Sequence, residues 1–409
     1  MSSGERSQSV AVLSADYELT RDDLQSDRLG LRSQVSRGGV AALSTNDAAV
    51  VAAALTSLDG WASEVRLIPP CVDVAAGVVE IEAVSAQIGG PTAEGDPLPD
   101  ATRWILYTSG TTGAPKSISH TLQTLTRTVA AGKPGSFIWG LLYDPNRMAG
   151  LQVLLQGLHS EATVVAPSLS QPLTARVQTL IDAGVNALSA TPSLWRQILQ
   201  LPISHEWDLR QITLGGEIAD QRVLDALASR FPSARVVHVF ASTETGAAFS
   251  VKDGLAGFPI EYLDDPPRGV RLEIRDDILH VYSPGVSSAE ADGFASTGDI
   301  VEIVDDRVLF NGRSSGVVNV GGTNVWPETV ETILREHPDV VEAVVSAKPN
   351  PMMGNVLIAQ VSLVDDADTE GVAKRLRRWV RDRAPGSHVP ASVAVVDELQ
   401  VSATGKVQR

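Results

Sequence analysis

The sequence predicts an α/β protein in two parts, a large N-terminal α/β domain and a small α+β C-terminal domain. Short apolar runs alternate with amphipathic stretches between about residues 162 and 240, and hairpin patterns with acidic turns follow residue 265. The pattern changes again near Gly312, where the small domain is expected to begin. Alternating strands and helices are typical of a mostly parallel sheet with helices on both faces, whereas strands joined by tight turns form antiparallel hairpins.

Hydrophobic periodicity places the elements of the large domain. Strands are expected at residues 39–44, 66–68, 162–166, 187–191, 211–214 and 236–240. Helices are expected at residues 45–58, 173–183, 192–199 and 220–231, and Thr45 or Asn46 is expected to cap the first of them. Residues 1–36 are polar with weak periodicity, so we expect only an opening segment at the domain edge.

Short turns and a new pattern define the rest of the chain. Hairpins are expected where residues 271–274 face 278–282 and where 300–304 face 308–310, each across a turn that contains two aspartates. Beyond Gly312 we expect a helix at 327–335, strands at 341–347 and 356–363, a helix at 369–383 and a strand at 393–396. The second helix carries one apolar face, so this unit of about 95 residues can form a core of its own.

Composition excludes several classes of function. At 409 residues the chain is too long to fold around one hydrophobic core of ordinary size, which predicts two or more domains or one large domain with an appendage. The net charge of −16, without a compensating run of Lys and Arg, argues against a nucleic-acid or anionic-membrane binder. Cys71 is the single cysteine, which excludes an internal disulfide and fits the reducing cytoplasm, where we expect the protein. No secretory signal follows Met1, and no apolar run reaches the roughly 18 residues of a membrane span.

One stretch, residues 104–120 (W-I-L-Y-T-S-G-T-T-G-A-P-K-S-I-S-H), organises the rest of the chain. Four apolar or aromatic residues predict a buried strand, small hydroxyl and glycine residues predict a loop closed by Lys116, and a helical pattern follows. Such a loop can wrap a polyphosphate, because glycines allow close backbone approach and a lysine brings positive charge. Residues 110–117 also match a Walker A loop except at Pro115, which removes a backbone donor that a P-loop needs.

The full pattern, Y-T-S-G-T-T-G-x-P-K, resembles the phosphate-binding signature of the adenylate-forming (AMP-binding) superfamily. That family comprises acyl-CoA synthetases, peptide-synthetase adenylation domains and luciferase-like enzymes. The alternatives are a P-loop NTPase and an ordinary Gly/Ser/Thr loop. By the resemblance, the loop holds the β- and γ-phosphates of ATP through Thr108, Ser109, Gly110, Thr111, Thr112, Gly113 and Lys116.

A second motif, Phe240-Ala241-Ser242-Thr243-Glu244, is similar to the family's Y-G-x-T-E. The resemblance implies that the aromatic ring stacks on adenine, that Thr243 binds the α-phosphate and that Glu244 ligates Mg²⁺. A carboxylate oxygen suits this hard cation, and a flat ring suits a purine. Phe240 stands where the family has Tyr, so the hydroxyl is missing. Ala241 stands where the family has Gly, and its methyl group leaves a ligand less room to approach the backbone. Taken alone, these residues would indicate only a strand end followed by a turn.

Two further motifs follow in the family's order. Ser296-Thr297-Gly298-Asp299 resembles the family's T-G-D, whose aspartate accepts both ribose hydroxyls; alone, it would be a turn-capping Asp. Gly312-Arg313 and Val320-Gly321-Gly322 resemble the hinge motif. This implies that Arg313 contacts ribose or phosphate and that Gly321 and Gly322 line the route of a pantetheine thiol. Ser315 stands at the hinge, where many members carry an acidic residue.

A C-terminal lysine and a pair of glycines complete the set. Thr404-Gly405-Lys406 resembles the family's N-x-x-G-K, whose lysine bridges the carboxylate and the α-phosphate during adenylation. Taken without its context, Lys406 would be a solvated tail residue. Leu214-Gly215-Gly216-Glu217 resembles the loop that lines the adenine and acyl pockets, so Gly215, Gly216 and Glu217 are expected there.

Arg147 departs from the family pattern. Residues 143–150 occupy the place of an aromatic-His-x-x-G element near the acyl pocket, and Arg147 stands where the histidine belongs. A guanidinium beside the reacting carboxyl could bind a second anionic group, such as a distal carboxylate or a small oxyanion. The alternative is a surface arginine on a turn. His120, at the start of the expected helix, is interpreted as structural.

The resemblance implies an AMP-binding domain over residues 1–312 with a shortened N-terminus, a mobile C-terminal lid over 313–409 and a hinge near 312–316. It implies an AMP-forming ligase that uses ATP and Mg²⁺ to adenylate a carboxylic acid, then passes the acyl group to a thiol of CoA or of carrier-protein phosphopantetheine. The phosphate loop begins early, near residue 107, which makes a carrier protein an alternative to free CoA. A small-molecule acid, small or aromatic, is the expected substrate.

Two other functions stay open. The chain could activate a small oxyanion such as nitrite for diazotisation of an aryl amine, which Arg147 and the short N-terminal region motivate. It could also be a non-catalytic nucleotide-binding relative, against which Lys116, Glu244, Asp299 and Lys406 argue. Acid-dependent release of pyrophosphate from ATP separates an enzyme from the non-catalytic relative. Comparing carboxylic acids with nitrite plus an aryl amine separates the two enzymes.

Overall fold

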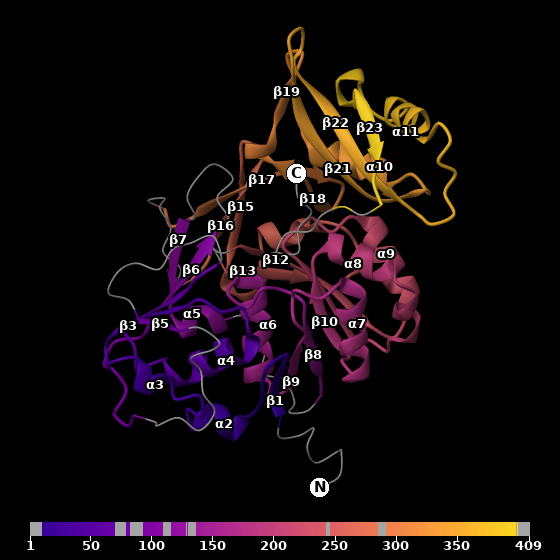
Figure 1. The fold of residues 1–409 in the computed structure, drawn as a ribbon. Coiled ribbons are helices and arrows are strands. Elements are labelled where there is room, and N and C mark those ends of the chain that lie inside the picture. Colours follow the sequence, from indigo (N-terminus) through magenta and orange to yellow (C-terminus); the bar gives the residue numbers. More distant parts are fainter. Residues whose placement is uncertain are drawn as a thin grey trace.

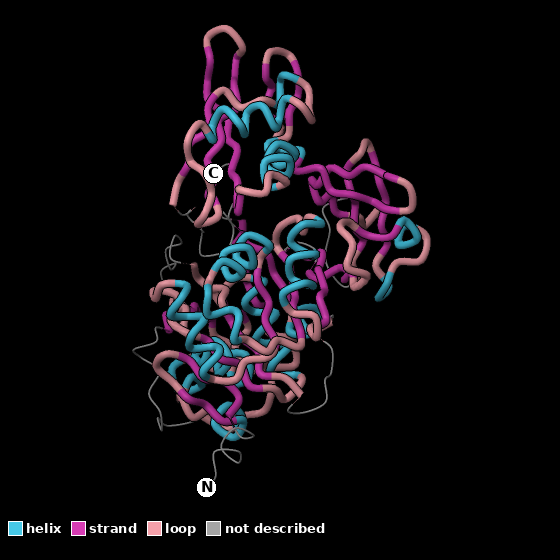
Figure 2. Tube along the Cα trace, turned by 90° about the vertical axis from the view of Figure 1, so that its right-hand side faces the viewer, coloured by secondary structure: helices cyan, strands magenta, loops and turns pink. Residues whose placement is uncertain are grey.

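The computed structural model describes residues 10–69, 79–81, 93–108, 116–127, 129, 136–242, 246–284, 292–397 and 399. Within these ranges the strands form four sheets, three in a large lobe (β1 to β18) and one in a small lobe (β19 to β23 with α10 and α11). The small lobe stands above the large one in both views (Figures 1 and 2). The predicted fold class, a large α/β part with a small α+β part, is therefore confirmed.

The largest sheet has eight strands in the order β13-β12-β11-β10-β8-β9-β1-β2. Its strands are β1 Val10–Ser14, β2 Glu18–Thr20, β8 Ile138–Leu141, β9 Thr163–Ala166, β10 Ala187–Ala190, β11 Gln211–Gly215, β12 Arg235–Ser242 and β13 Gly246–Val251. The six inner strands are parallel and the two edge strands are antiparallel. The intervening helices are α6 Met148–His159, α7 Leu173–Asp182, α8 Pro192–Gln200 and α9 Gln221–Arg230. The carboxyl ends of β10, β11 and β12 therefore meet at one edge, where ligands of such sheets bind.

A five-stranded sheet in the order β5-β3-β4-β6-β7 lies beside the first. Its strands are β3 Val40–Leu43, β4 Glu64–Leu67, β5 Val79–Ile81, β6 Arg103–Thr108 and β7 Lys116–His120, and its helices are α2 Arg21–Gln25, α3 Leu31–Gln34, α4 Ala48–Ser57 and α5 Leu122–Thr126. Helix α4 is apolar on nearly every side and buried, because it packs on β1 of the first sheet as well as on α2 and α3. One continuous core joins both sheets.

Three expectations for this region were wrong. Asp47 caps α4 in place of Thr45 or Asn46, since its Oδ1 accepts hydrogen bonds from Ala49 N (2.8 Å) and Val50 N (3.2 Å). Residues 10–14 form a strand that is parallel to β9 inside the main sheet, not a loose opening segment. The phosphate loop leads into strand β7 and not directly into a helix, because residues 116–120 pair antiparallel with β6.

The third sheet of the large lobe is antiparallel, in the order β14-β18-β17-β16-β15. Its strands are β14 Phe258–Pro259, β15 Arg271–Arg275, β16 Ile278–Tyr282, β17 Ala295–Val304 and β18 Arg307–Arg313. The turns of both predicted hairpins place aspartate at positive φ, at Asp276 and Asp277 in one and at Asp305 in the other. Asp tolerates this left-handed region better than most residues, which explains why aspartate-rich turns predicted both hairpins correctly.

The small lobe has its own sheet and its own core. Its elements are β19 Val318–Val320, β20 Thr323–Val325, α10 Pro327–Arg335, β21 Val340–Asn350, β22 Gly354–Leu363, α11 Val372–Arg381 and β23 Ser392–Val395. Val372, Leu376 and Val380 of α11 are buried against this sheet, as their helical spacing predicted. The short turn η5, Ser314–Gly316, joins the two lobes; the remaining turns are η2 Pro202–Glu206, η3 Ile260–Leu263, η4 Pro267–Gly269 and η6 Gly386–His388.

Candidate active site

A cavity of about 610 Å³ lies between the two lobes. The large lobe contributes the carboxyl ends of β11 and β12, the start of α8, the middle of β17 and the second half of β18, and the small lobe contributes α10 and β21. Six of the residues predicted from the sequence line it: Gly216, Glu217, Phe240, Ala241, Asp299 and Arg313. A volume of this size suits a small molecule, since such sites span roughly 300–1,000 Å³.

Asp299 and Arg313 face each other across neighbouring strands at the mouth of the cavity. They are paired in the register of β17 and β18, and Arg313 Nε lies 3.0 Å from Asp299 Oδ1. The Asp299 side chain is only about 10% exposed, whereas that of Arg313 is 54% exposed. The backbone N–H of Asp299 donates to Thr297 Oγ1 at 3.0 Å, which fixes the T-G-D turn. A buried carboxylate beside a mobile cation can accept hydroxyl donors from a sugar.

Phe240 belongs to a stack of aromatic rings at the end of β12. Its ring lies parallel to Phe249 (centroids 5.2 Å apart) and to Phe310 (5.4 Å apart). Phe249 and Phe310 also line the cavity, and neither was singled out from the sequence. The half-buried Phe240 ring is therefore held in one orientation by its neighbours. Ala241 and Ser242 follow it at the strand end, and Ala241 lines the cavity.

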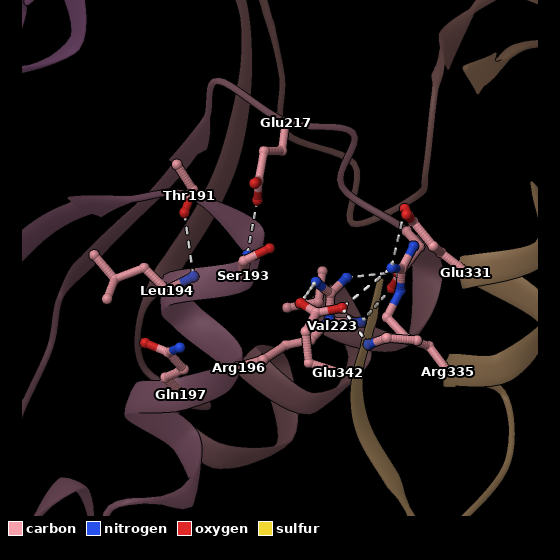
Figure 3. A network of polar contacts seen from close by, with 12 residues as sticks. Thr191, Ser193, Leu194, Arg196, Gln197, Glu217, Val223, Glu331, Arg335 and Glu342 are labelled. Atoms are coloured by element: carbon pink, nitrogen blue, oxygen red, sulfur yellow. Dashed lines mark hydrogen bonds and ion pairs between the residues drawn. The ribbon is translucent and has the colours of Figure 1, made fainter. Parts of the chain in front are cut away.

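The loop after β11 is fixed to the start of α8. Gly215 ends the strand and Gly216 has a φ of 82°, a left-handed conformation that suits glycine. Glu217 then turns back, and its Oε2 accepts a hydrogen bond from Ser193 N at 3.0 Å, at the N-terminus of α8 (Figure 3). Burial raises the pKa of Glu217, although the Ser193 N–H counteracts it. Glu217 thus links the loop after β11 to the N-terminus of α8.

Lys116 begins β7, directly opposite Thr108 at the end of β6. The two strands form a hairpin whose connection is the predicted phosphate loop. Ser109, Gly110, Thr111, Thr112 and Gly113 lie outside the described residues. His120 ends β7 with its side chain 4% exposed, and its Nδ1 lies 3.4 Å from Thr124 Oγ1. This fits the structural role that was expected for His120.

Arg147 lies at the start of α6, beside the base of the phosphate loop. Its Nη1 donates to the carbonyl oxygen of Tyr107 at 3.0 Å, and its Nε lies 4.0 Å from Asp144 Oδ2. The side chain is 14% exposed and does not line the large cavity. The Arg147 side chain therefore links the predicted acyl-pocket element to the strand that carries the phosphate loop.

Gly321 and Gly322 lie away from the cavity. They form the tip of the β19–β20 hairpin, where Gly321 N donates to Met353 O at 3.0 Å and Gly322 N donates to Asn319 Oδ1 at 3.1 Å. Figure 1 shows this hairpin at the end of the small lobe that points away from the large lobe. The arrangement seen here does not bring the two glycines to the residues around Asp299.

The C-terminal end of the described chain returns to the large lobe. Leu399 is buried, and its carbonyl oxygen accepts from Gln197 Nε2 of α8 at 3.3 Å. Lys406, Thr243 and Glu244 lie outside the described residues. Within the described ranges, no group of three or more His, Cys, Asp or Glu side chains is placed to hold a metal ion. No described helix has the length and apolar character to cross a membrane.

Comparison with known families decides the identity of the chain. The family model described as AMP-binding enzyme matches residues 11–287. The chain is an AMP-binding enzyme. A second model, AMP-binding enzyme C-terminal domain, matches residues 329–406, which include β21, β22 and β23, most of α10, all of α11 and Lys406. The adenylate-forming resemblance inferred from the motifs is therefore confirmed.

Relatives of this AMP-binding enzyme include ligases of carboxylic acids. It is 27% identical over 345 residues to human mitochondrial acyl-coenzyme A synthetase ACSM1, a match that covers 75% of this chain and 60% of the relative. It is 26% identical over 330 residues to a 2-succinylbenzoate–CoA ligase of Listeria monocytogenes, covering 75% and 68%. The aligned part of this AMP-binding enzyme thus spans about three fifths of the human relative.

The fold of this AMP-binding enzyme matches solved structures along almost its whole length. An anthranilate CoA ligase in complex with anthranoyl-AMP superposes with a TM-score of 0.78 at 17% identity, over 98% of this chain and 93% of the other. At this identity the likeness establishes the fold alone.

Besides Phe249 and Phe310, sequence reasoning missed a charged feature of this AMP-binding enzyme that borders the cavity. Arg196, Asp220, Arg335 and Glu342 form a buried set of ion pairs that joins the lobes. Arg196 and Glu342 are 146 residues apart, and no local pattern links them. The charged pair Glu331 and Arg335, four residues apart in the predicted helix 327–335, was the one available signal, because residues at this spacing lie on the same face of a helix.

Proposed function

We propose that the protein is an AMP-forming ligase that adenylates a carboxylic acid with ATP and transfers the acyl group to a thiol. The observation that carries the proposal is the cavity itself. One wall holds the Asp299–Arg313 pair, Phe240 and the glycine turn after β11, and the other wall belongs to the small lobe. A site with one wall in each lobe can present two different sets of groups to one bound intermediate.

The chemistry requires activation because a carboxylate is a poor electrophile. One of its oxygens attacks the α-phosphorus of ATP, the bond to the bridging oxygen of the β-phosphate breaks, and pyrophosphate leaves. The thiol sulfur then attacks the acyl carbon, the proton of the thiol is lost, and AMP leaves. The first transition state is strongly anionic, so cations must be placed before the reaction begins.

The proposed roles follow the motifs. Asp299 accepts hydrogen bonds from the ribose hydroxyls. The adenine base lies against Phe240 and the turn at Gly215 and Gly216. Residues 108–116 hold the β- and γ-phosphates. Thr243 contacts the α-phosphate, and Glu244 would hold Mg²⁺, which supplies positive charge to the phosphate oxygens. Lys406 brings its ammonium between the carboxylate and the α-phosphate. Leu399 contacts Gln197 of α8, the helix whose Ser193 and Arg196 line the cavity, and seven residues can span up to roughly 25 Å, which is ample for this approach.

Alternation of the small lobe is part of the proposal, with a boundary near residue 312 and a hinge at 312–316. Gly312 has a φ of 139° and a Cβ there would lie 2.9 Å from Glu328 Oε2, so the junction admits only glycine without a shift. In the present arrangement the Gly321–Gly322 tip is remote and the Leu399 segment is close, which suits adenylation. A rotation about the hinge would exchange the two and admit the pantetheine thiol.

The proposed substrate is a small or aromatic acid. A relative named for 2-succinylbenzoate supports an aryl acid, and a relative in a nonribosomal peptide synthetase supports a carrier-protein thiol beside CoA as acceptor. Arg147 would contribute by holding the base of the phosphate loop through the carbonyl oxygen of Tyr107. Its contact with the acid stays a prediction. The single cysteine suits a reducing, cytoplasmic setting.

Pyrophosphate release from ATP across a panel of carboxylic acids tests the proposal. We expect release that depends on a carboxylic acid, followed by acyl-thioester formation when CoA or a phosphopantetheinyl carrier protein is added. Nitrite with aminoaryl acids belongs in the same panel. Release with nitrite and an aryl amine but with no acid alone would support the diazotase instead, and no release under any condition would overturn the proposal.

A further inference from the structure

Four buried side chains form a closed ring of alternating charge between the lobes (Figure 3). Arg196 lies on α8 and Asp220 caps α9, both in the large lobe, whereas Arg335 ends α10 and Glu342 lies in β21, both in the small lobe. Arg196 contacts Asp220 (2.6 Å) and Glu342 (2.8 Å), and Arg335 contacts Asp220 (3.1 Å) and Glu342 (3.1 Å). Each charge therefore has two opposite neighbours in the ring, and Arg335 has a third outside it, Glu331 of the same helix, at 4.0 Å.

The ring is divided evenly between the lobes. The Arg196–Asp220 and Arg335–Glu342 pairs each lie within one lobe, and the Arg196–Glu342 and Arg335–Asp220 pairs cross the junction. Separation of the lobes would break the two crossing pairs but leave Arg196 with Asp220 in the large lobe and Arg335 with Glu342 and Glu331 in the small lobe. No charge would be stranded, which is the event that makes breaking a buried ion pair strongly unfavourable.

Burial makes the closed ring strong. The four side chains are between 3% and 13% exposed, so dissolved salt screens them weakly. Burial alone would raise the pKa of Asp220 and of Glu342, but the guanidinium groups of Arg196 and Arg335 outweigh it and lower both. Both carboxyls thus stay ionised while the ring is closed.

The ring also lies at the site. All four side chains line the cavity, and Gln197, next to Arg196, holds the carbonyl oxygen of Leu399. While the ring is closed, the segment that leads to Lys406 therefore contacts the same helix that carries Arg196, and the Gly321–Gly322 tip is remote. We infer that Arg196, Asp220, Arg335 and Glu342 are positioning residues that hold the small lobe for the adenylation half-reaction and release it for thioester formation. This inference rests on the proposed function.

An exchange of two charges within the small lobe tests the ring. The double variant Arg335→Glu with Glu342→Arg keeps opposite charges at positions 335 and 342 but makes both crossing contacts repulsive. It also replaces the 4.0 Å contact of Arg335 with Glu331 by two like charges, which the new arginine at position 342 offsets. We expect acid-dependent pyrophosphate exchange to fall by about tenfold or more, because two attractive contacts become repulsive. Thioester formation from a supplied acyl-adenylate should stay within about twofold of the wild type.

The matched control is the exchange Arg378→Asp with Asp382→Arg on α11. This pair lies in the same lobe, is exposed and does not touch the large lobe. It should leave both half-reactions unchanged. Arg196→Gln serves as a second variant should the exchange fold poorly, because Arg335 still contacts both carboxylates. It should lower pyrophosphate exchange in the same direction, by less.

A distance measurement makes the test independent of activity. Spin labels on cysteines at Gln178 of α7 and Lys374 of α11, with Cys71 replaced by serine, report the separation of the lobes. The wild type should populate one short distance, and Arg335→Glu with Glu342→Arg should broaden or lengthen it. Unchanged distances, or equal losses in both half-reactions, would overturn the inference. A changed distance in a protein that never releases pyrophosphate would support the ring and refute only the proposed function.

Discussion

Asp299 is the side chain on which we propose that nucleoside recognition depends. Its carboxylate is buried at the cavity mouth with Arg313 beside it. Asp299→Asn keeps the shape but removes the charge, and charge-assisted hydrogen bonds contribute about 1.5–3 kcal/mol. We expect the KM for ATP to rise by at least about tenfold in pyrophosphate exchange, since about 1.4 kcal/mol corresponds to tenfold. Asp253→Asn, which removes the similar partner of Arg307, is the control and should leave this KM unchanged.

Lys406 has a role in one half-reaction only, if the proposed alternation is correct. Lys406→Ala should abolish adenylation of the free acid, because the anionic transition state loses its mobile cation. Thioester formation from a supplied acyl-adenylate should persist. Arg409→Ala, three residues further along, removes a nearby charge and is the control. Equal loss of both half-reactions in Lys406→Ala would contradict the assigned role.

His238, a lining residue of the cavity, should make stability depend on pH. Burial lowers its pKa, although the carbonyl oxygen of Leu255 and the charge of Asp253 counteract this. In the unfolded chain histidine titrates near about 6.5. Between that value and the lower folded pKa the unfolded state binds more protons, so stability falls as pH falls through this window.

His238→Gln should flatten that dependence, because the glutamine amide can still donate to Leu255 but does not titrate. The melting temperature of the wild type should fall more between pH 7.5 and pH 5.5 than that of the variant. His205→Gln, at an exposed position, is the matched control. Parallel pH profiles for the wild type and His238→Gln would refute the assignment.

At the scale of elements, the sequence was most informative where a local signal sufficed. Pro327 at the first turn and an apolar face predicted α10 with its observed limits, Pro327–Arg335. The two aspartate turns predicted both hairpins of the third sheet. Strand β1 was not predicted, because its parallel partner β9 lies about 150 residues away in the sequence. Strand β7, Lys-Ser-Ile-Ser-His, was not predicted, because its single apolar residue, Ile118, does not form the alternating apolar pattern that indicates a strand.

The core of the small lobe should unfold separately from that of the large lobe. Leu376 of α11 is fully buried in a cluster made only of small-lobe residues. Leu376→Ala should destabilise that lobe by about 2–5 kcal/mol through the lost contacts and the cavity left behind. Scanning calorimetry should show one transition lowered and the other unchanged. Lys374→Ala, exposed on the same helix, is the control, and a single transition shifted as a whole would contradict separate cores.

At the scale of the whole molecule, motifs along the chain predicted the site better than they predicted its arrangement. Phe240, Asp299, Arg313, Gly216 and Glu217 line one cavity although up to 97 residues separate Gly216 from Arg313. The motif order carried that information. The orientation of the small lobe is set by ion pairs between distant residues, which no single motif records.

The cavity has one wall in each lobe, and each lobe has its own core. A chamber built in this way needs no exit tunnel, because departure of one wall exposes its whole content at once. The lifetime of an activated acid before hydrolysis then depends on how long the small lobe stays closed. It does not depend on how closely the cavity residues pack around the acid. An acceptor cannot reach the intermediate while the small lobe covers it. An acceptor that is already bound beside the cavity when the small lobe moves reacts with the intermediate before water does.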